Sequence, residues 1–195
     1  MNLVKATIVI ACALTTVTAR SQTHAADPGP YAGEQSRAIK ALSASEVDDL
    51  RAGRGMGLSK AAELNHKAGP RHVLDLADPL ALSDVQRAEV QDTFDRMAGV
   101  AKTIGAAILD KERALDAHFA RNDAGPAEVE RSIDEIARLQ GQLRFTHIDA
   151  HMRTAHVLTA DQIAAYDRLR GYDGTSGVRS VGAGEDGGAT HEHSH

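Results

Sequence analysis

The sequence predicts an all-α protein built on a long antiparallel helical hairpin with short flanking helices. Its composition favours helices, because Ala, Leu, Glu, Asp, Arg and Gln dominate while aromatic residues make up only 3% of the 195 residues. Two long segments carry apolar residues at alternating steps of three and four, the spacing of one helix face. Three Ser or Thr residues are followed three positions later by Glu or Gln, which is typical of a capped helix start.

The first helices are predicted to be short. Ser43 can accept from the backbone N–H of Glu46 while the Glu46 carboxylate reaches back, so a helix begins there. We expect further short helices at 58–65 and 70–77. Pro70 suits the first position of a helix, where its missing N–H is not needed.

The first long helix is predicted to begin after Ser83, with Gln86 completing the capping box. Asn122 and the Gly125 that follows end it. The inward face of this helix is predicted to carry Phe94, Ala98, Ala101, Gly105, Ile108, Leu115 and Phe119.

The second long helix is predicted to begin at or near Pro126, after a loop so short that the two helices must run antiparallel. A last helix begins after Thr159, with Gln162 completing its capping box, and ends at Gly171. The inward residues predicted for these two helices are Val129, Ile133, Ile136, Gln140, Leu143, His147, Ala150 and Thr154, then Ile163, Tyr166 and Leu169.

The N-terminus has the pattern of a secretory signal peptide. Lys5 precedes the apolar stretch Ala6–Ala19, which is shorter than the roughly 20 residues that a membrane-spanning helix needs. Small residues offer cleavage points after Ala19 and after Ala25. We therefore expect an exported protein without a stable membrane span in its mature form. The alternatives are an uncleaved anchor and a lipoprotein, since the sequence around Cys12 resembles a lipobox.

Four regions are expected along the chain: a signal peptide at 1–25, a linker at 26–33, a helical domain at 34–172 and a disordered Gly- and His-containing tail at 173–195. The net charge of −5 gives no indication of a nucleic-acid partner. The single cysteine excludes an intrachain disulfide. No nucleophile motif or paired-carboxylate site is recognisable, so we expect neither an enzyme nor an organic cofactor.

Two of the capped helix starts share a longer motif, L-[ST]-x-x-Q. One copy places Leu82 before Ser83 and ends at Gln86, and the other comprises Leu158, Thr159 and Gln162. Two such copies flanking a helical hairpin, behind a signal peptide, resemble the LTxxQ-motif family of periplasmic stress proteins. This is the Spy/CpxP/ZraP family, which includes CnrX-like heavy-metal resistance and sensor proteins. The resemblance covers about residues 31 to 172.

This resemblance implies a non-enzymatic homodimer in which two hairpins interlock into a cradle. It implies ATP-independent, chaperone-like binding of unfolded or misfolded envelope proteins, or modulation of envelope-stress signalling through a sensor kinase or other regulatory partner. Divalent-metal binding accompanies either role. The alternative it implies is a dedicated heavy-metal sensor or sequestering protein for zinc, copper or nickel.

The histidines offer the recognisable metal-ligand chemistry. His147 and His151 are four residues apart on one predicted helix, so their rings lie one above the other. The hairpin register places Met97 opposite them, and a thioether beside two imidazoles favours copper or a sensor-like site. The alternative is that His147 is a hydrogen-bonded core residue and His151 a half-exposed flank residue.

A second group of histidines ends the chain. His191, His193 and His195 are closely spaced in the predicted tail, where they can bind divalent metal without a preformed cage. The alternative is a solubilising tail.

Overall fold

The computed structural model describes residues 28–123 and 125–174, and every regular element in these ranges is helical. The chain divides into two compact units, one ending at Gln35 and the other beginning at Ser36, and the features below belong to the second unit. The predicted signal peptide, Cys12 and the tail beyond residue 174 lie outside the described residues. The elements are η1 (Glu34–Ser36), α1 (Ala44–Ala52), α2 (Lys60–Glu63), α3 (Pro70–Asp75), α4 (Asp84–Arg121), α5 (Pro126–Val157) and α6 (Ala160–Arg170).

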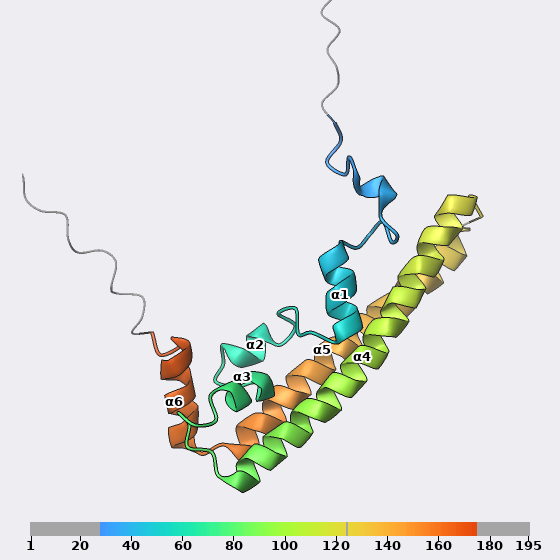
Figure 1. Ribbon diagram of the computed structural model, residues 1–195. Helices are drawn as coiled ribbons and strands as arrows, with labels where there is room; N and C mark the ends of the chain where they lie inside the picture. Colours follow the sequence, from blue (N-terminus) through green and yellow to red (C-terminus); the bar gives the residue numbers. More distant parts are fainter. Residues whose placement is uncertain (1–27, 124, 175–195) are drawn as a thin grey trace, which may run out of the picture. The chain divides into compact units, whose positions relative to one another are not determined.

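Helices α4 and α5 form the predicted long antiparallel pair, and the short helices flank it (Figure 1). Asn122 ends α4 in the left-handed conformation, with φ of 56°, and Pro126 opens α5 in its first turn. The two helices bury a shared core that includes Ile108 of α4 and Leu139 and Leu143 of α5. The all-α hairpin expected from periodicity and capping is thereby confirmed.

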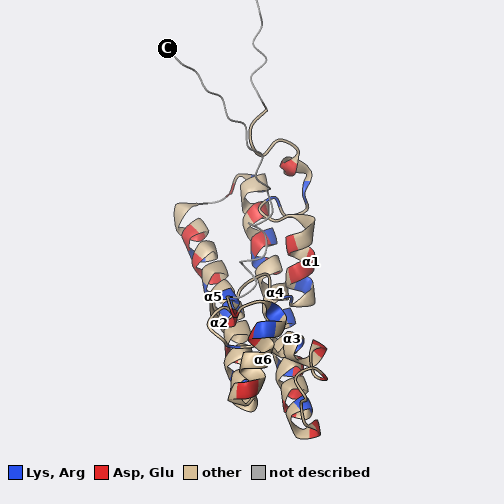
Figure 2. Cartoon of the chain, turned by 90° about the vertical axis from the view of Figure 1, so that its left-hand side faces the viewer, with Lys and Arg blue, Asp and Glu red and all other residues tan. Residues whose placement is uncertain are grey.

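Helix α1 packs against α4 with almost no space between their backbones. A Cβ added at Gly105 of α4 would lie 2.0 Å from the backbone oxygen of Leu50 in α1. Only glycine permits this approach, because every other residue carries a Cβ atom. The Ser43–Glu46 capping box is present, and Gly53 ends α1 with φ of 65°. In Figure 1, α1, α2 and α3 lie on one side of the hairpin, and Figure 2 looks onto that side.

A second core joins the open end of the hairpin to α3 and α6. Tyr166 of α6 and Leu158, which precedes that helix, are buried with Val73 of α3 and Val90 of α4. Tyr166 and Val73 are almost completely enclosed. This core fixes the segment between α3 and α4 against the segment between α5 and α6.

The two L-[ST]-x-x-Q motifs meet in space at this end of the hairpin. Ser83 and Thr159 each accept from the backbone N–H three residues later, as predicted, which completes both capping boxes. The side-chain amide of Gln86 donates to the Gln162 oxygen at 2.8 Å, and the Gln162 amide donates back at 3.1 Å. Each glutamine also donates to a backbone oxygen of the other segment, Val157 for Gln86 and Leu80 for Gln162.

The structure corrects several predicted positions. Phe119, Ile133 and Leu169 were expected inward, but their exposed fractions are 60%, 52% and 51%. Gln140 is exposed too, and its predicted place in the core is taken by Leu139. Gln140 is misplaced because the buried side of α5 follows Leu139 and Leu143 instead. Phe119, Ile133 and Leu169 continue an apolar pattern, but they remain exposed, so periodicity alone does not predict burial there.

The short helices also differ from their predicted bounds. Helix α2 spans only Lys60–Glu63 instead of 58–65, and α3 ends at Asp75 instead of residue 77. Both helices end early and continue as turns. Helices this short have few internal hydrogen bonds, so packing rather than local sequence decides where they end. Within residues 28–123 and 125–174, no helix combines the length and apolarity that crossing a membrane requires.

Candidate functional site

One cavity brings together three of the residues that the sequence singled out as metal ligands. Met97 of α4 and His147 and His151 of α5 all line a cavity of about 940 Å³. The turn between α1 and α2, helix α2 and the start of α3 form its opposite wall. We call it the inner cavity, since it lies between the short helices and the hairpin.

His151 is buried and both of its ring nitrogens have partners. Nδ1 lies 2.7 Å from the backbone oxygen of Lys67, and Nε2 lies 2.8 Å from the Ser59 hydroxyl. A carbonyl only accepts, so Nδ1 carries the proton and Nε2 accepts from Ser59. The expectation of a half-exposed flank residue was wrong, because His151 holds the α2–α3 segment against the hairpin and is covered by it.

His147 is more deeply buried, with an exposed fraction of 3%, and it differs from His151 in its partners. Its Nε2 is enclosed and has no hydrogen-bond partner among the described residues. Burial, and then the neighbouring His151, lowers the pKa of His147 below its ordinary value. The alternative reading of a neutral core histidine therefore fits its burial and its pKa but leaves one nitrogen unsatisfied, which costs free energy.

A buried carboxylate lies next to His151. Glu63 of α2 accepts from the Tyr166 hydroxyl at 2.5 Å, and its other oxygen lies 3.4 Å from His151 Nδ1. The guanidinium of Arg170 is 3.7 Å from Glu63. Burial and the bond to Glu63 raise the pKa of the Tyr166 phenol far above its ordinary value. This network joins α2, α5 and α6 behind the inner cavity.

A second histidine–carboxylate pair continues the network toward α6. His66 Nδ1 lies 2.7 Å from Asp167, whose other carboxylate oxygen is buried without a partner among the described residues. His72 of α3 lines the inner cavity and has a lowered pKa, caused first by burial and then by Arg170. Neither His66 nor His72 was predicted as a ligand.

The two candidate histidines of the cavity are not joined by a third His, Cys, Asp or Glu ligand among the described residues. In residues 28–123 and 125–174, no group of three or more His, Cys, Asp or Glu side chains is arranged to hold a metal ion. His147 offers one free nitrogen, while His151 would have to release Ser59 before its Nε2 could bind a metal. The predicted tail ligands His191, His193 and His195 lie outside the described residues.

The other side of the hairpin carries a separate depression that only α4 and α5 line. We call it the outer groove. Its apolar members include Val100 and Phe145, with exposed fractions of 48% and 65%. Its remaining lining residues are Thr93, Arg96, Met97, Thr146, Asp149, Ala150 and Arg153. Apolar side chains that gather in one depression indicate a candidate binding surface, whereas single exposed apolar residues are ordinary.

Several functional residues had no signal in the sequence. Ser59 and Glu63 contact His151, and Tyr166 donates to Glu63, although all three are remote from His151 along the chain or lie in another helix. Comparison of the chain with protein-family models, with curated proteins and with solved structures found no match. The function is therefore argued from the geometry of the cavity and the groove.

Proposed function

We propose that this chain is an exported periplasmic stress protein that holds unfolded or misfolded envelope proteins without ATP. The outer groove is the binding surface in this proposal, and a sensor kinase or similar regulatory partner would use the same surface. The observation that carries the proposal is the exposed Phe145 and Val100 on a side of the hairpin to which no short helix contributes. Met152, about two turns beyond Phe145 along α5, is also about half exposed.

The composition of the groove suits a client without a fixed shape. Apolar side chains attract exposed hydrophobic segments, because burying apolar surface is favourable at about 25 cal/mol per Å². Arg96, Arg153 and Asp149 border the apolar residues and keep the surface hydrated between clients. Arg153 pairs with Asp149 at 2.6 Å, so the groove has a charged edge beside its apolar residues.

The test mixes a denatured client protein with about an equimolar amount of this protein in the absence of nucleotide. Light scattering then measures how far aggregation of the client is suppressed. Phe145→Ser should lose most of the suppression. Val85→Ser is the matched control, because Val85 is an equally exposed apolar residue of the hairpin that lines neither the groove nor the proposed dimer contact. Wild-type protein that fails to suppress aggregation, or equal loss in the two variants, contradicts the proposal.

The second candidate function is metal sensing or sequestration, favoured by the inner cavity. Met97, His147 and His151 line it together, and His147 Nε2 has no described partner. The Nδ1 proton of His151 is held by a backbone carbonyl, an arrangement that orients many metal-binding histidines. These donors would suit copper, zinc or nickel, with the imidazoles neutral.

Calorimetric titration of the full chain with zinc, copper and nickel separates this candidate from the first. One variant combines His147→Ala with His151→Ala, and a second replaces His191, His193 and His195 by Ala. Loss of micromolar binding in the first variant alone favours the cavity as a metal site. Loss only in the second assigns the affinity to the tail and leaves the first function preferred.

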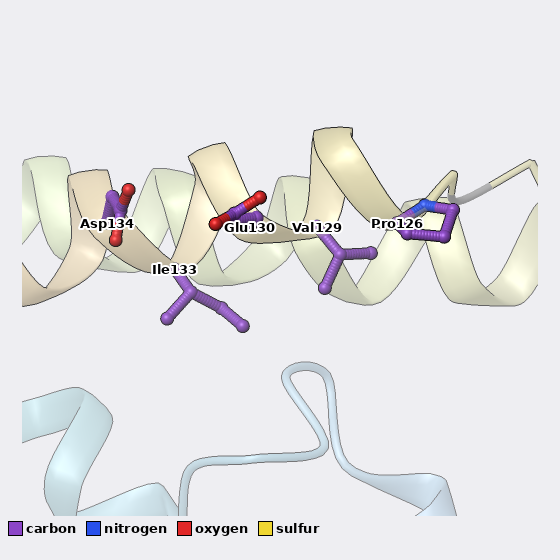
Figure 3. Close-up of a pocket in the computed structure, with 5 residues that line it drawn as sticks. All are labelled: Pro126, Val129, Glu130, Ile133 and Asp134. Atoms are coloured by element: carbon purple, nitrogen blue, oxygen red, sulfur yellow. The ribbon is translucent and has the colours of Figure 1, made fainter.

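We propose a homodimer as well, with the loop end of the hairpin as its contact. Phe119 is exposed on α4 there, and Val129 and Ile133 point to the same side of α5 (Figure 3). A second copy would bury these side chains. Sedimentation equilibrium should give twice the chain mass for wild type and the monomer mass for Phe119→Ser with Ile133→Ser.

A further inference from the structure

The inner cavity has a lining that neither the chaperone-like function nor a metal site uses. Its charged residues are five cations and three carboxylates, since Arg54, Lys60, Arg71, Lys102 and Arg170 face Asp49, Glu63 and Asp95. A lining with more cations than carboxylates attracts an anion.

The carboxylates of the lining are already bound within the protein. Asp49 lies 2.5 Å from Arg54, Glu63 accepts from Tyr166, and Asp95 accepts from Gln91. By contrast, neither the Lys60 nor the Lys102 ammonium has a carboxylate within 4 Å among the residues that the structure describes. Lys60 lies on α2 and Lys102 on α4, so the two free ammonium groups come from opposite walls.

The rest of the lining is apolar or neutral. Met56, Pro70, Phe94, Met97 and Ala98 supply apolar surface. His147 stays neutral near pH 7 because burial lowers its pKa, and a neutral imidazole can contribute a hydrogen bond without adding charge. The volume of about 940 Å³ lies within the range of small-molecule sites. A purely ionic ligand would leave this apolar surface unused.

We propose that the inner cavity binds a small amphiphilic anion, an aliphatic carboxylate whose head lies between Lys60 and Lys102 and whose chain lies against Met56 and Met97. This site shares Met97 with the outer groove but no other lining residue, and it does not rest on the function proposed above. A carboxylate accepts from two ammonium groups in charge-assisted hydrogen bonds, which are stronger than neutral ones.

The methionines provide reporters of where a ligand binds. Met56 lines the inner cavity alone, Met97 lines both the inner cavity and the outer groove, and Met152 lines neither. In the full chain labelled with ¹³C at the methionine methyl groups, decanoate should shift the Met56 and Met97 signals and leave Met152 unchanged. Shifts of Met97 without Met56 would place the ligand in the outer groove and overturn the proposal, as would an equal shift of Met152.

Matched ligands test the chemistry of the head and the chain. Decyltrimethylammonium has the same chain with a cationic head, and inorganic phosphate is an anion without a chain. Both should bind at least about tenfold more weakly than decanoate by calorimetry, because each lacks one of the two interactions. Equal affinity of either compound overturns the proposal, and so does the absence of any decanoate binding.

Matched variants test the two lysines. Lys60→Gln with Lys102→Gln should weaken decanoate binding by about tenfold or more, since both charge-assisted bonds are lost. Lys40→Gln with Lys111→Gln removes the same charge from two lysines that pair with Asp116 and Glu135 away from the cavity. This control should bind decanoate as wild type does. Equal weakening in both double variants would show a non-specific charge effect and overturn the proposal.

Discussion

Gln86 and Gln162 each donate a side-chain hydrogen bond to the other, although they end two motif copies that lie 76 residues apart. Each glutamine oxygen also accepts from the backbone N–H of its own cap residue, Ser83 or Thr159. Each glutamine side chain therefore caps its own helix and also binds the glutamine that caps the other helix. This dual role explains why the repeated motif needs Gln rather than Glu at its last position, since only the amide donates.

Replacing Gln86 by Glu separates these two roles. The carboxylate still accepts from the Ser83 N–H but cannot donate to Gln162 or to the Val157 oxygen, so we expect a loss of about 1–3 kcal/mol in the free energy of unfolding. Urea unfolding measures it. Ser83→Ala is the comparison, because it removes the cap alone at a cost of about 0.5–2 kcal/mol. Wild-type stability in Gln86→Glu would show that the pair between the motifs contributes nothing.

Two glycines of α4 should respond to alanine in opposite directions. At Gly105 the added Cβ meets the backbone oxygen of Leu50 at 2.0 Å, and backbone cannot rotate away, so Gly105→Ala should lose about 1–3 kcal/mol or more. At Gly99 nothing lies within 4 Å, so Gly99→Ala should gain about 0.5–1 kcal/mol through helix propensity. Thermal unfolding of both variants checks this pair. A shift of the same sign in both would refute the close approach of α1.

The features that the sequence predicted are those set by neighbours along the chain. Each capping box depends on a Ser or Thr and a Glu or Gln three residues apart, and all three boxes are present. The position of His147 and His151 on one side of α5, where both line the inner cavity, follows from helical spacing in the same way. Burial was predicted less well, because Phe119 and Ile133 continue the apolar pattern beyond the part of the hairpin that other helices cover.

The hydrogen-bond partners of His151 could not be predicted, because they come from segments that are remote along the chain. Ser59 and Lys67 bind His151 across 92 and 84 residues of sequence, from segments whose helices are too short to show a period. The His151 ring also packs closely against Gly69, where an added Cβ would lie 2.6 Å from it. Such contacts depend on the tertiary structure and leave no local pattern.

Tyr166→Phe should test the buried network behind the cavity. The phenol donates to Glu63, and its removal leaves that carboxylate buried without a hydrogen-bond donor at normal distance, so we expect a loss of about 1–3 kcal/mol. Tyr172→Phe is the matched control, because the Tyr172 hydroxyl accepts from Arg170 near the surface and should contribute less than about 1 kcal/mol. Denaturant unfolding measures the free energy of unfolding of both variants. Equal losses would show that the buried Tyr166–Glu63 hydrogen bond stabilises the fold no more than a surface hydrogen bond does.

The lowered pKa of His147 predicts how stability depends on pH. His147 in the folded protein takes up a proton less readily than His147 in the unfolded chain. The contribution of His147 to the free energy of unfolding is therefore fully present above the ordinary pKa of 6.5 and is lost as pH falls below it. The loss cannot exceed about 1.4 kcal/mol per pH unit for one group. His72, whose pKa is also lowered by burial, adds to the same trend.

His147→Leu should therefore flatten the stability profile between about pH 8 and about pH 5, measured by urea unfolding. It should also cost little at the upper end of this range, because it removes an unsatisfied buried nitrogen along with the ring. His156→Leu changes an exposed histidine of the same helix and is the control. If His156→Leu flattens the profile as strongly as His147→Leu, burial of His147 is not the cause of the pH dependence.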